Sequence, residues 1–186
     1  WSMEELSSVS IDDEKAGETI VDYLIEHGHT KIAEIGANLE LSQTARLRHN
    51  GYLNSLKKHG ITPDERYYER ARFSYDSAYR AMKKLLEKDI EITAVYAISD
   101  VMAIGALRAI LDKGLRVPED ISITGFDGST LAEYYNPKIV SIRQPHKDMA
   151  ARSVELLFNM IDLHKGSCHE IIPFELTEGE SVARID

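Results

Sequence analysis

Five polar or aromatic side chains stand beyond the ends of predicted β-strands, the first of them in the helix that follows its strand. They are Arg48, Tyr75, Ser99, Asp127 and Gln144. A guanidinium fork and a carboxylate can each engage two neighbouring hydroxyl groups, and an aromatic ring can cover the apolar face of a sugar or stack on a base. Because parallel strands bring their carboxyl ends to one edge of a sheet, we expect these side chains to gather there around a small polar ligand.

The elements that would position these residues are clearest between residues 94 and 127. The apolar run 94–98 has no polar alternation, which predicts a strand buried on both faces. A helix capped by Ser99 or Asp100 follows and ends at Gly114, and residues 121–126 form the next strand. A strand, helix and strand of this length predict a right-handed parallel crossover.

The rest of the chain repeats this alternation. Further strands are predicted at residues 31–35, 66–71, 138–142 and 171–176, and a short strand-like piece precedes residue 12. Helices are predicted at about 12–28, 42–59, 74–86, 130–136 and 148–163. The predicted fold class is therefore α/β, with a parallel sheet and helices on both faces.

Composition limits the classes of function. The 186 residues are 43% hydrophobic, enough for a substantial core, and 22 basic against 31 acidic residues give a net charge of −9. This charge repels a phosphate backbone, so we expect any DNA contact to come from elsewhere in the protein. A single cysteine, Cys168, excludes an internal disulfide and fits a cytoplasmic location, and no apolar run is long enough to span a bilayer.

Metal and catalytic motifs are missing from the sequence. His27 and His29 straddle a helix end, and His164, Cys168 and His169 lie near the end of another helix, but neither group has the spacing of a zinc site. There is no dinucleotide-binding glycine motif, no phosphate-binding loop and no Gly-x-Ser-x-Gly elbow. We therefore expect no metal, no cofactor and no enzymatic activity.

Three motifs resemble those of one known family. They are Ser-Asp-x-Met-Ala-x-Gly-Ala-Leu-Arg-Ala at 99–109, Gly-Leu-x-Val-Pro-Glu-Asp-Ile-Ser-Ile-x-Gly-Phe-Asp at 114–127, and Thr-Ala-Arg-Leu-Arg-x-x-Gly-Tyr at 44–52. Together they resemble the effector-binding region of the lactose/galactose repressor (LacI/GalR) family of bacterial transcription regulators. The first two agree in composition and spacing with that family over more than twenty residues.

The resemblance implies a periplasmic-binding-protein-like type I fold, with two α/β subdomains joined by three crossing strands. Residues 1–11 would be the end of a truncated N-terminal subdomain and the first crossover, and 12–143 the nearly complete C-terminal subdomain. Residues 144–170 would return a helix to the N-terminal subdomain, and 171–186 would hold the final crossover strand and the tail. The implied function is that of an effector sensor which changes DNA binding allosterically through a hinge.

The resemblance also implies roles for single residues. Arg48, the second arginine of the motif that begins at Thr44, and Asp127 match positions that contact effector in the family, and Tyr75 matches an aromatic position. Ser99 stands where many members have asparagine, so its hydrogen bond is in question. Gln144 and His146 lie on a crossing segment, where ligand or hinge contacts are implied.

Each role has a plainer structural alternative. Arg48 could be a solvated helix residue, Tyr75 a core or surface aromatic, and Asp127 the cap of a turn. The preferred reading of Asp100 is a helix cap only, and Gln144 and His146 could simply support the backbone.

The helix at residues 101–111 is apolar on nearly every side, which predicts that its outer stripe meets another protein surface. We expect a homodimer through this helix and the helix at 78–86, as in the family, with cover by a neighbouring loop as the alternative. An exported sugar-binding protein of a transporter, an enzyme on a similar sheet, and a family member that responds to a purine remain the rival interpretations. The sequence does not identify the effector, the operator, or whether the effector induces or co-represses.

Overall fold

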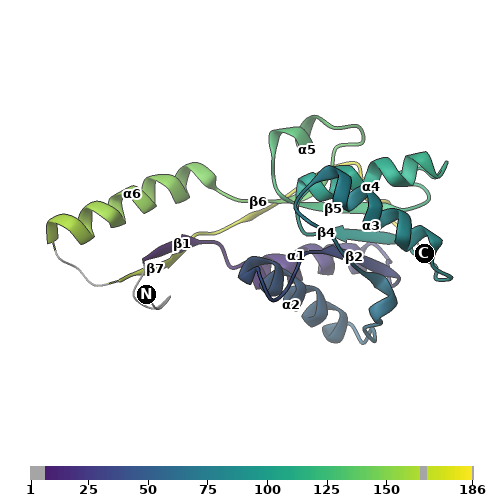
Figure 1. Ribbon diagram of the computed structural model, residues 1–186, viewed down its shortest axis with the longest axis horizontal. Helices are drawn as coiled ribbons and strands as arrows, with labels where there is room; N and C mark the ends of the chain where they lie inside the picture. The colour runs from purple at the N-terminus through teal and green to yellow at the C-terminus, as the bar shows by residue number, and fades with distance from the viewer. Residues whose placement is uncertain (1–6, 164–166, 186) are drawn as a thin grey trace.

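The computed structural model describes residues 7–163 and 167–185, which form an α/β body and an arm that extends from one end of it (Figure 1). The elements of the body are α1 (Asp13–Glu26), β2 (Ile32–Gly36), α2 (Gln43–Lys58), a 3-10 turn (Glu65–Tyr67), β3 (Tyr68–Arg70), α3 (Tyr75–Glu87), β4 (Ala94–Ala97), α4 (Asp100–Asp112), β5 (Ser122–Asp127), α5 (Thr130–Tyr134), β6 (Val140–Arg143) and β8 (Glu175–Thr177). The arm consists of β1 (Ser8–Ser10), α6 (His146–Leu163) and β7 (His169–Ile171).

The described part of the body is built on a six-stranded sheet in the order β3-β2-β4-β5-β6-β8. All neighbouring strands are parallel except β8, which runs antiparallel to β6. Helices α1 and α2 cover one face and α3 and α4 the other (Figure 1). Every residue of β2 and β4 is buried, because helices exclude water from both faces of the sheet. The predicted fold class is confirmed.

The four large helices of the body begin at the edge where the parallel strands end, and each begins with a side-chain cap. Asp12, Ser42, Ser74 and Ser99 cap α1, α2, α3 and α4, and each side chain accepts a hydrogen bond from the backbone N–H three residues later. Each cap satisfies a donor that the first helical turn leaves free. One edge of the sheet therefore gathers four helix amino ends as well as the carboxyl ends of the parallel strands.

Two predicted elements differ from the structure. The single strand predicted at 171–176 is two strands, β7 in the arm and β8 in the body, because Pro173 lies between them in a stretch that crosses from one part to the other. Proline has no N–H to donate to a ladder. The strand predicted at 66–71 is shorter, because the 3-10 turn occupies its first residues.

The covering of α4 bears on the expected dimer surface, which stays a prediction. Most of its residues are buried within the chain, because α3 packs along it. A Cβ atom at Gly105 would overlap the backbone carbonyl of Tyr75, so the two helices meet backbone to backbone at this point. The outer stripe of α4 is therefore narrower than predicted: Leu111, at 43% exposure, is its large exposed apolar side chain.

Helices α1 and α2 approach each other as closely. A Cβ atom at Gly17 would stand 2.7 Å from the carbonyl oxygen of Arg48, and one at Gly51 would overlap the backbone of Glu14. Such close backbone approach requires glycine. It places the backbone of Arg48 against Gly17 of α1, and the Arg48 side chain reaches Asp13 in the first turn of that helix.

Candidate ligand-binding site

Arg48 lies at the centre of a polar cluster at the carboxyl edge of the sheet. Its Nε donates to Asp13 Oδ1 at 2.8 Å, and its Nη1 donates to the carbonyl oxygen of Ile98 at 2.7 Å and to Asp127 Oδ1 at 3.4 Å. The guanidinium carbon lies 3.5 Å from the ring centroid of Phe126, a cation–π contact. With only 5% of its side chain exposed, the guanidinium is held in one orientation by partners from α1, from β5 and from the residue that follows β4.

Asp127 is the last residue of β5 and reaches the same cluster. Its φ of 109° is in a region that non-glycine residues rarely adopt, which is typical of residues that the surrounding structure holds in place for a function. Gln144, which follows β6, holds it: Nε2 donates to Asp127 Oδ1 at 2.8 Å, and the backbone N–H donates to the Asp127 carbonyl at 3.3 Å. Burial raises the pKa of the Asp127 carboxyl, although Arg48 opposes this, and nearby Asp100 adds to the rise.

Asp100 is not the cap of α4, which corrects the preferred reading from the sequence. Ser99 is the cap, with its Oγ accepting from the N–H of Met102 at 3.3 Å. Asp100 is buried and accepts from Ser141 Oγ and from the backbone N–H of Ser129, both at 2.6 Å. Burial raises the pKa of this carboxyl. Asp100 thus links α4 to β6 and to the loop after β5. Ser99 is buried, and its Oγ is already used in the hydrogen bond that caps α4.

The structure brings three of the predicted site residues together and leaves four apart. Arg48, Asp127 and Gln144 form the cluster described above. The others are Ser99, buried at the start of α4; Thr44, half-buried in the first turn of α2; Tyr75, half-exposed at the start of α3; and His146, exposed at the start of α6. No ligand role for any of these seven residues follows from position alone, and all remain predictions.

Sequence reasoning missed three residues. Asp13 accepts a hydrogen bond from Arg48, and the ring of Phe126 packs against its guanidinium. Phe73, rather than Tyr75, is the aromatic residue that lines a hollow at the ends of β2 and β3. Phe126 and Phe73 each lie at or near the end of a predicted strand, so the rule that strand ends gather at one edge could have identified them. No spacing rule connects Asp13 with Arg48, which is 35 residues away.

Within residues 7–163 and 167–185, no group of three His, Cys, Asp or Glu side chains could hold a metal ion. Buried His29 instead bridges Thr93 Oγ1 and the carbonyl oxygen of Ala183. His164 lies outside the described residues. No helix among the described residues has the length and hydropathy needed to cross a membrane.

The chain thus folds as a wound parallel sheet with an arm joined through several strands, and the charged cluster lies at the edge of the sheet that faces this arm (Figure 1). The chain belongs to the periplasmic binding protein-like domain family, which matches residues 21–182. Its relatives within that family are LacI-type transcriptional regulators rather than enzymes.

Three comparisons illustrate this kinship. The HTH-type transcriptional regulator MalR of Clostridium butyricum is 41% identical over 179 residues, which cover 96% of this chain and 53% of the relative. The HTH-type transcriptional repressor PurR of Pasteurella multocida (strain Pm70) is 39% identical over 140 residues, 75% of this chain and 42% of the relative. The solved structure of a transcriptional regulator CelR–cellobiose complex superposes with a TM-score of 0.92 at 34% identity, covering 97% of this chain and 55% of that one. The chain thus spans about half the length of these relatives.

Proposed function

We propose that this chain is the effector-sensing part of a LacI/GalR-type transcription regulator, and that a small sugar-like ligand binds at the Arg48–Asp127–Gln144 cluster. One observation carries the proposal: a charged donor and a charged acceptor stand side by side, each with an unused atom. Arg48 Nη2 and Asp127 Oδ2 make no hydrogen bond with any described residue.

This pairing suits a sugar. A hydroxyl group can accept from the guanidinium while it, or its neighbour on the ring, donates to the carboxylate. About a third of the Asp127 side chain is exposed, so a ligand can reach it. The Arg48 guanidinium is already fixed in place and would lose little conformational entropy on binding. Because the guanidinium is already aimed by Asp13 and Phe126, the cluster is pre-organised for its ligand.

A purine is the second candidate. The similarity to the HTH-type transcriptional repressor PurR and the half-exposed ring of Phe73, on which a base could stack, favour it. A transport-linked sugar-binding protein is disfavoured, because the relatives reported above are named as transcriptional regulators.

The proposed output is a hinge motion. Residues 12–143 would act as the ligand-binding subdomain, and the arm, with α6 from residue 146 onward, would belong to the part that moves against it. A ligand bound at the edge that faces the arm would favour one orientation of the arm relative to residues 12–143. The ligand site and the DNA-binding site would then be coupled through the segments that connect these two parts. Operator DNA would be bound elsewhere in the full-length cytoplasmic protein, because this segment carries a net charge of −9.

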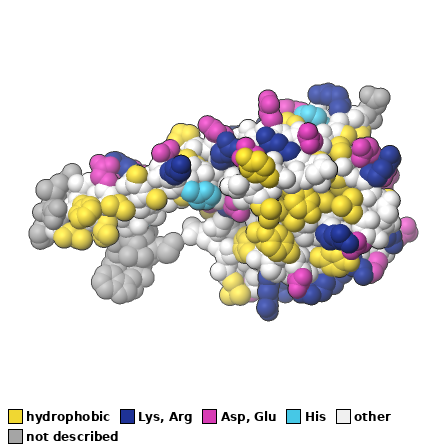
Figure 2. Space-filling model, turned by 90° about the horizontal axis from the view of Figure 1, so that it is seen from above, with side chains coloured by type: hydrophobic (Ala, Val, Ile, Leu, Met, Phe, Trp, Pro, Cys, Tyr) yellow, Lys and Arg dark blue, Asp and Glu magenta, His cyan; other side chains and the backbone are white. Residues whose placement is uncertain are grey.

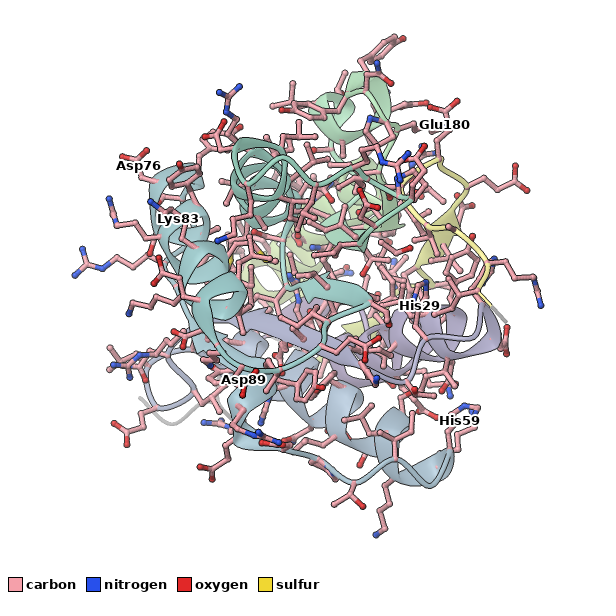
Figure 3. All side chains as sticks on the ribbon, turned by 90° about the vertical axis from the view of Figure 1, so that its right-hand side faces the viewer. His29, His59, Asp76, Lys83, Asp89 and Glu180 are labelled. Carbon is pink, nitrogen blue, oxygen red and sulfur yellow. The ribbon has the colours of Figure 1, made fainter. Side chains whose placement is uncertain are left out.

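A binding experiment on the full-length protein tests the ligand site. Isothermal titration with a panel of sugars and purines is expected to identify a ligand whose affinity falls at least about tenfold in Asp127→Asn, since the variant loses a charged acceptor. Asp89→Asn is the matched control: Asp89 is exposed and lies at the end of the body that faces away from the arm (Figure 3). Unchanged binding in Asp127→Asn would place the site elsewhere.

We also propose that the protein forms a homodimer through the outer surface of α3 and α4. The face of the body in Figure 2 carries a broad hydrophobic area. A shallow hollow of about 340 Å³ lies between the two helices, lined by Tyr79, Leu86 and Ala109 and by the charged residues Lys83, Glu87, Asp112 and Lys113. Leu111 is also exposed on α4. Apolar groups beside charges of both signs fit a contact between two copies.

Sedimentation equilibrium tests the dimer. Leu111→Glu is expected to give a monomer, because it would place a charge in an apolar contact. Ile161→Glu is the control, since Ile161 is also an exposed apolar residue but lies on α6, in the arm. If wild type is monomeric at micromolar concentration, or if the Leu111 variant stays dimeric, this surface is not the interface.

A further inference from the structure

A second feature of the carboxyl edge is a hollow of about 490 Å³ between the ends of β2 and β3. Its polar and aromatic lining includes Asn38, Ser42, Arg70, Arg72, Phe73 and Ser77. The volume is within the range of small-molecule sites. The hollow shares no lining residue with the Arg48–Asp127–Gln144 cluster, but Ser42 caps the helix that carries Arg48, so the two features are neighbours along the same edge.

The two arginines in this hollow are unpaired among the described residues. Arg70 ends β3 and Arg72 follows it by two positions, and neither guanidinium makes a salt bridge or a side-chain hydrogen bond with a described residue. Some other exposed arginines of this acidic chain have carboxylate partners, as in the pairs of Arg66 with Asp64 and Arg116 with Asp120. Two free guanidinium groups at one hollow are a ready receptor for an anion.

Two helix amino ends add to this positive potential. Ser42 caps α2, which has 16 residues, and Ser77 lies in the first turn of α3, which has 13. Both oxygens accept from backbone N–H groups, Ser42 Oγ from Ala45 and Ser77 Oγ from Arg72, so each hydroxyl hydrogen remains available to a ligand. Helix amino ends favour anions.

The other lining residues indicate which chemical group is attached to the anion. Phe73 is 50% exposed in the hollow and offers a ring face that can cover the apolar face of a sugar. Three carboxylates are adjacent in sequence to lining residues, namely Glu40, Glu69 and Asp76, and none of them lines the hollow. Glu69 pairs with Lys88 instead. Its volume exceeds what one inorganic ion fills, which leaves space for an organic group.

We propose that this hollow binds the phosphoryl group of a phosphorylated sugar effector, with Arg70 and Arg72 as its cationic contacts. The inference rests on the proposed function, because the sugar ring would extend from Phe73 along the edge toward Thr44 and Arg48. It narrows the effector class from neutral sugars to sugar phosphates. The two exposed arginines then act as specificity residues, while Arg48 and Asp127 hold the hydroxyl groups.

Isothermal titration of the full-length protein with matched pairs tests the inference: glucose and glucose 6-phosphate, ribose and ribose 5-phosphate, and inorganic phosphate alone. At least one sugar phosphate is expected to bind about tenfold or more tightly than its parent sugar, and this advantage should shrink as salt is added. The double variant Arg70→Gln/Arg72→Gln should abolish the advantage without changing affinity for the parent sugar. Arg66→Gln/Arg116→Gln is the control and should behave as wild type.

Each other outcome is decisive. If a sugar binds but its phosphate binds no better, or if the advantage survives in the double variant, the phosphoryl site is refuted while the proposed function stands. If inorganic phosphate alone binds as tightly as the sugar phosphate, the hollow is a separate anion site and the inference about the effector is wrong. If neither sugars, sugar phosphates nor purines bind, the proposed function fails as well.

Discussion

Replacing Arg48 by methionine tests how much the central cluster contributes to stability. Methionine keeps a long side chain over the ring of Phe126 but removes the cation that lies 2.8 Å from Asp13 and 3.4 Å from Asp127. Removing one partner of a buried ion pair costs about 3–5 kcal/mol. Because a third of the Asp127 side chain is exposed and water relieves it, we expect a loss near the lower limit, about 3 kcal/mol.

Urea unfolding at pH 7, followed by circular dichroism, measures this loss. The single variants Arg48→Met and Asp13→Asn and their combination form a double-mutant cycle, and the two effects should fail to add by about 1–3 kcal/mol, because both remove the same contact. Arg66→Met, at an exposed ion pair, should unfold close to wild type. The reasoning is refuted if Arg48→Met lies within about 0.5 kcal/mol of wild type, or if the two single effects are additive.

Three further predictions concern the packing and ionisation around the site. Gly51→Ala should destabilise the protein by about 1–3 kcal/mol in urea unfolding, despite the better helix propensity of alanine, because the new methyl group overlaps the backbone of α1; a more stable variant would contradict this. Burial lowers the pKa of His49, but the buried Glu34 carboxylate 2.6 Å away gives a net rise. A raised folded-state pKa means that the ion pair of His49 with Glu34 contributes fully to the unfolding free energy below about pH 6.5. This contribution is lost as the pH rises through the folded-state pKa of His49. The resulting fall of the unfolding free energy with pH, measured by urea unfolding, should be absent in His49→Gln. Ser141→Ala should cost about 1–3 kcal/mol in thermal or urea unfolding, because it removes a buried donor to Asp100, and a neutral result would show that Asp100 does not need it.

The alternation of strands and helices was predictable because it depends on local sequence. Continuous apolar runs such as 94–98 indicate strands buried on both faces, and serines such as Ser42 and Ser99 mark helix starts. The split between β7 and β8 was not predicted, because one apolar stretch serves two different sheets and only tertiary structure decides where it leaves the first. The cover that α3 gives α4 is likewise a tertiary contact.

The candidate site was predictable to the extent that strand ends determine it. Arg48, Asp127 and Gln144 meet because helices and strands end at one edge, which the order of elements already implied. Asp13 could not be found in this way, because its role depends on how closely two glycines let α1 approach α2. The residue that aims the guanidinium is therefore specified by packing between helices rather than by a motif.

The connection between arm and body has a mechanical consequence. Three separate stretches of chain link them: the one from β1 to α1, the one from β6 to α6, and the one from β7 to β8 (Figure 1). A single tether would allow the arm to spin, but three tethers anchored side by side resist torsion and leave bending as the soft deformation. On the function proposed above, we therefore expect a ligand at the edge between the two parts to tilt the arm in one defined direction.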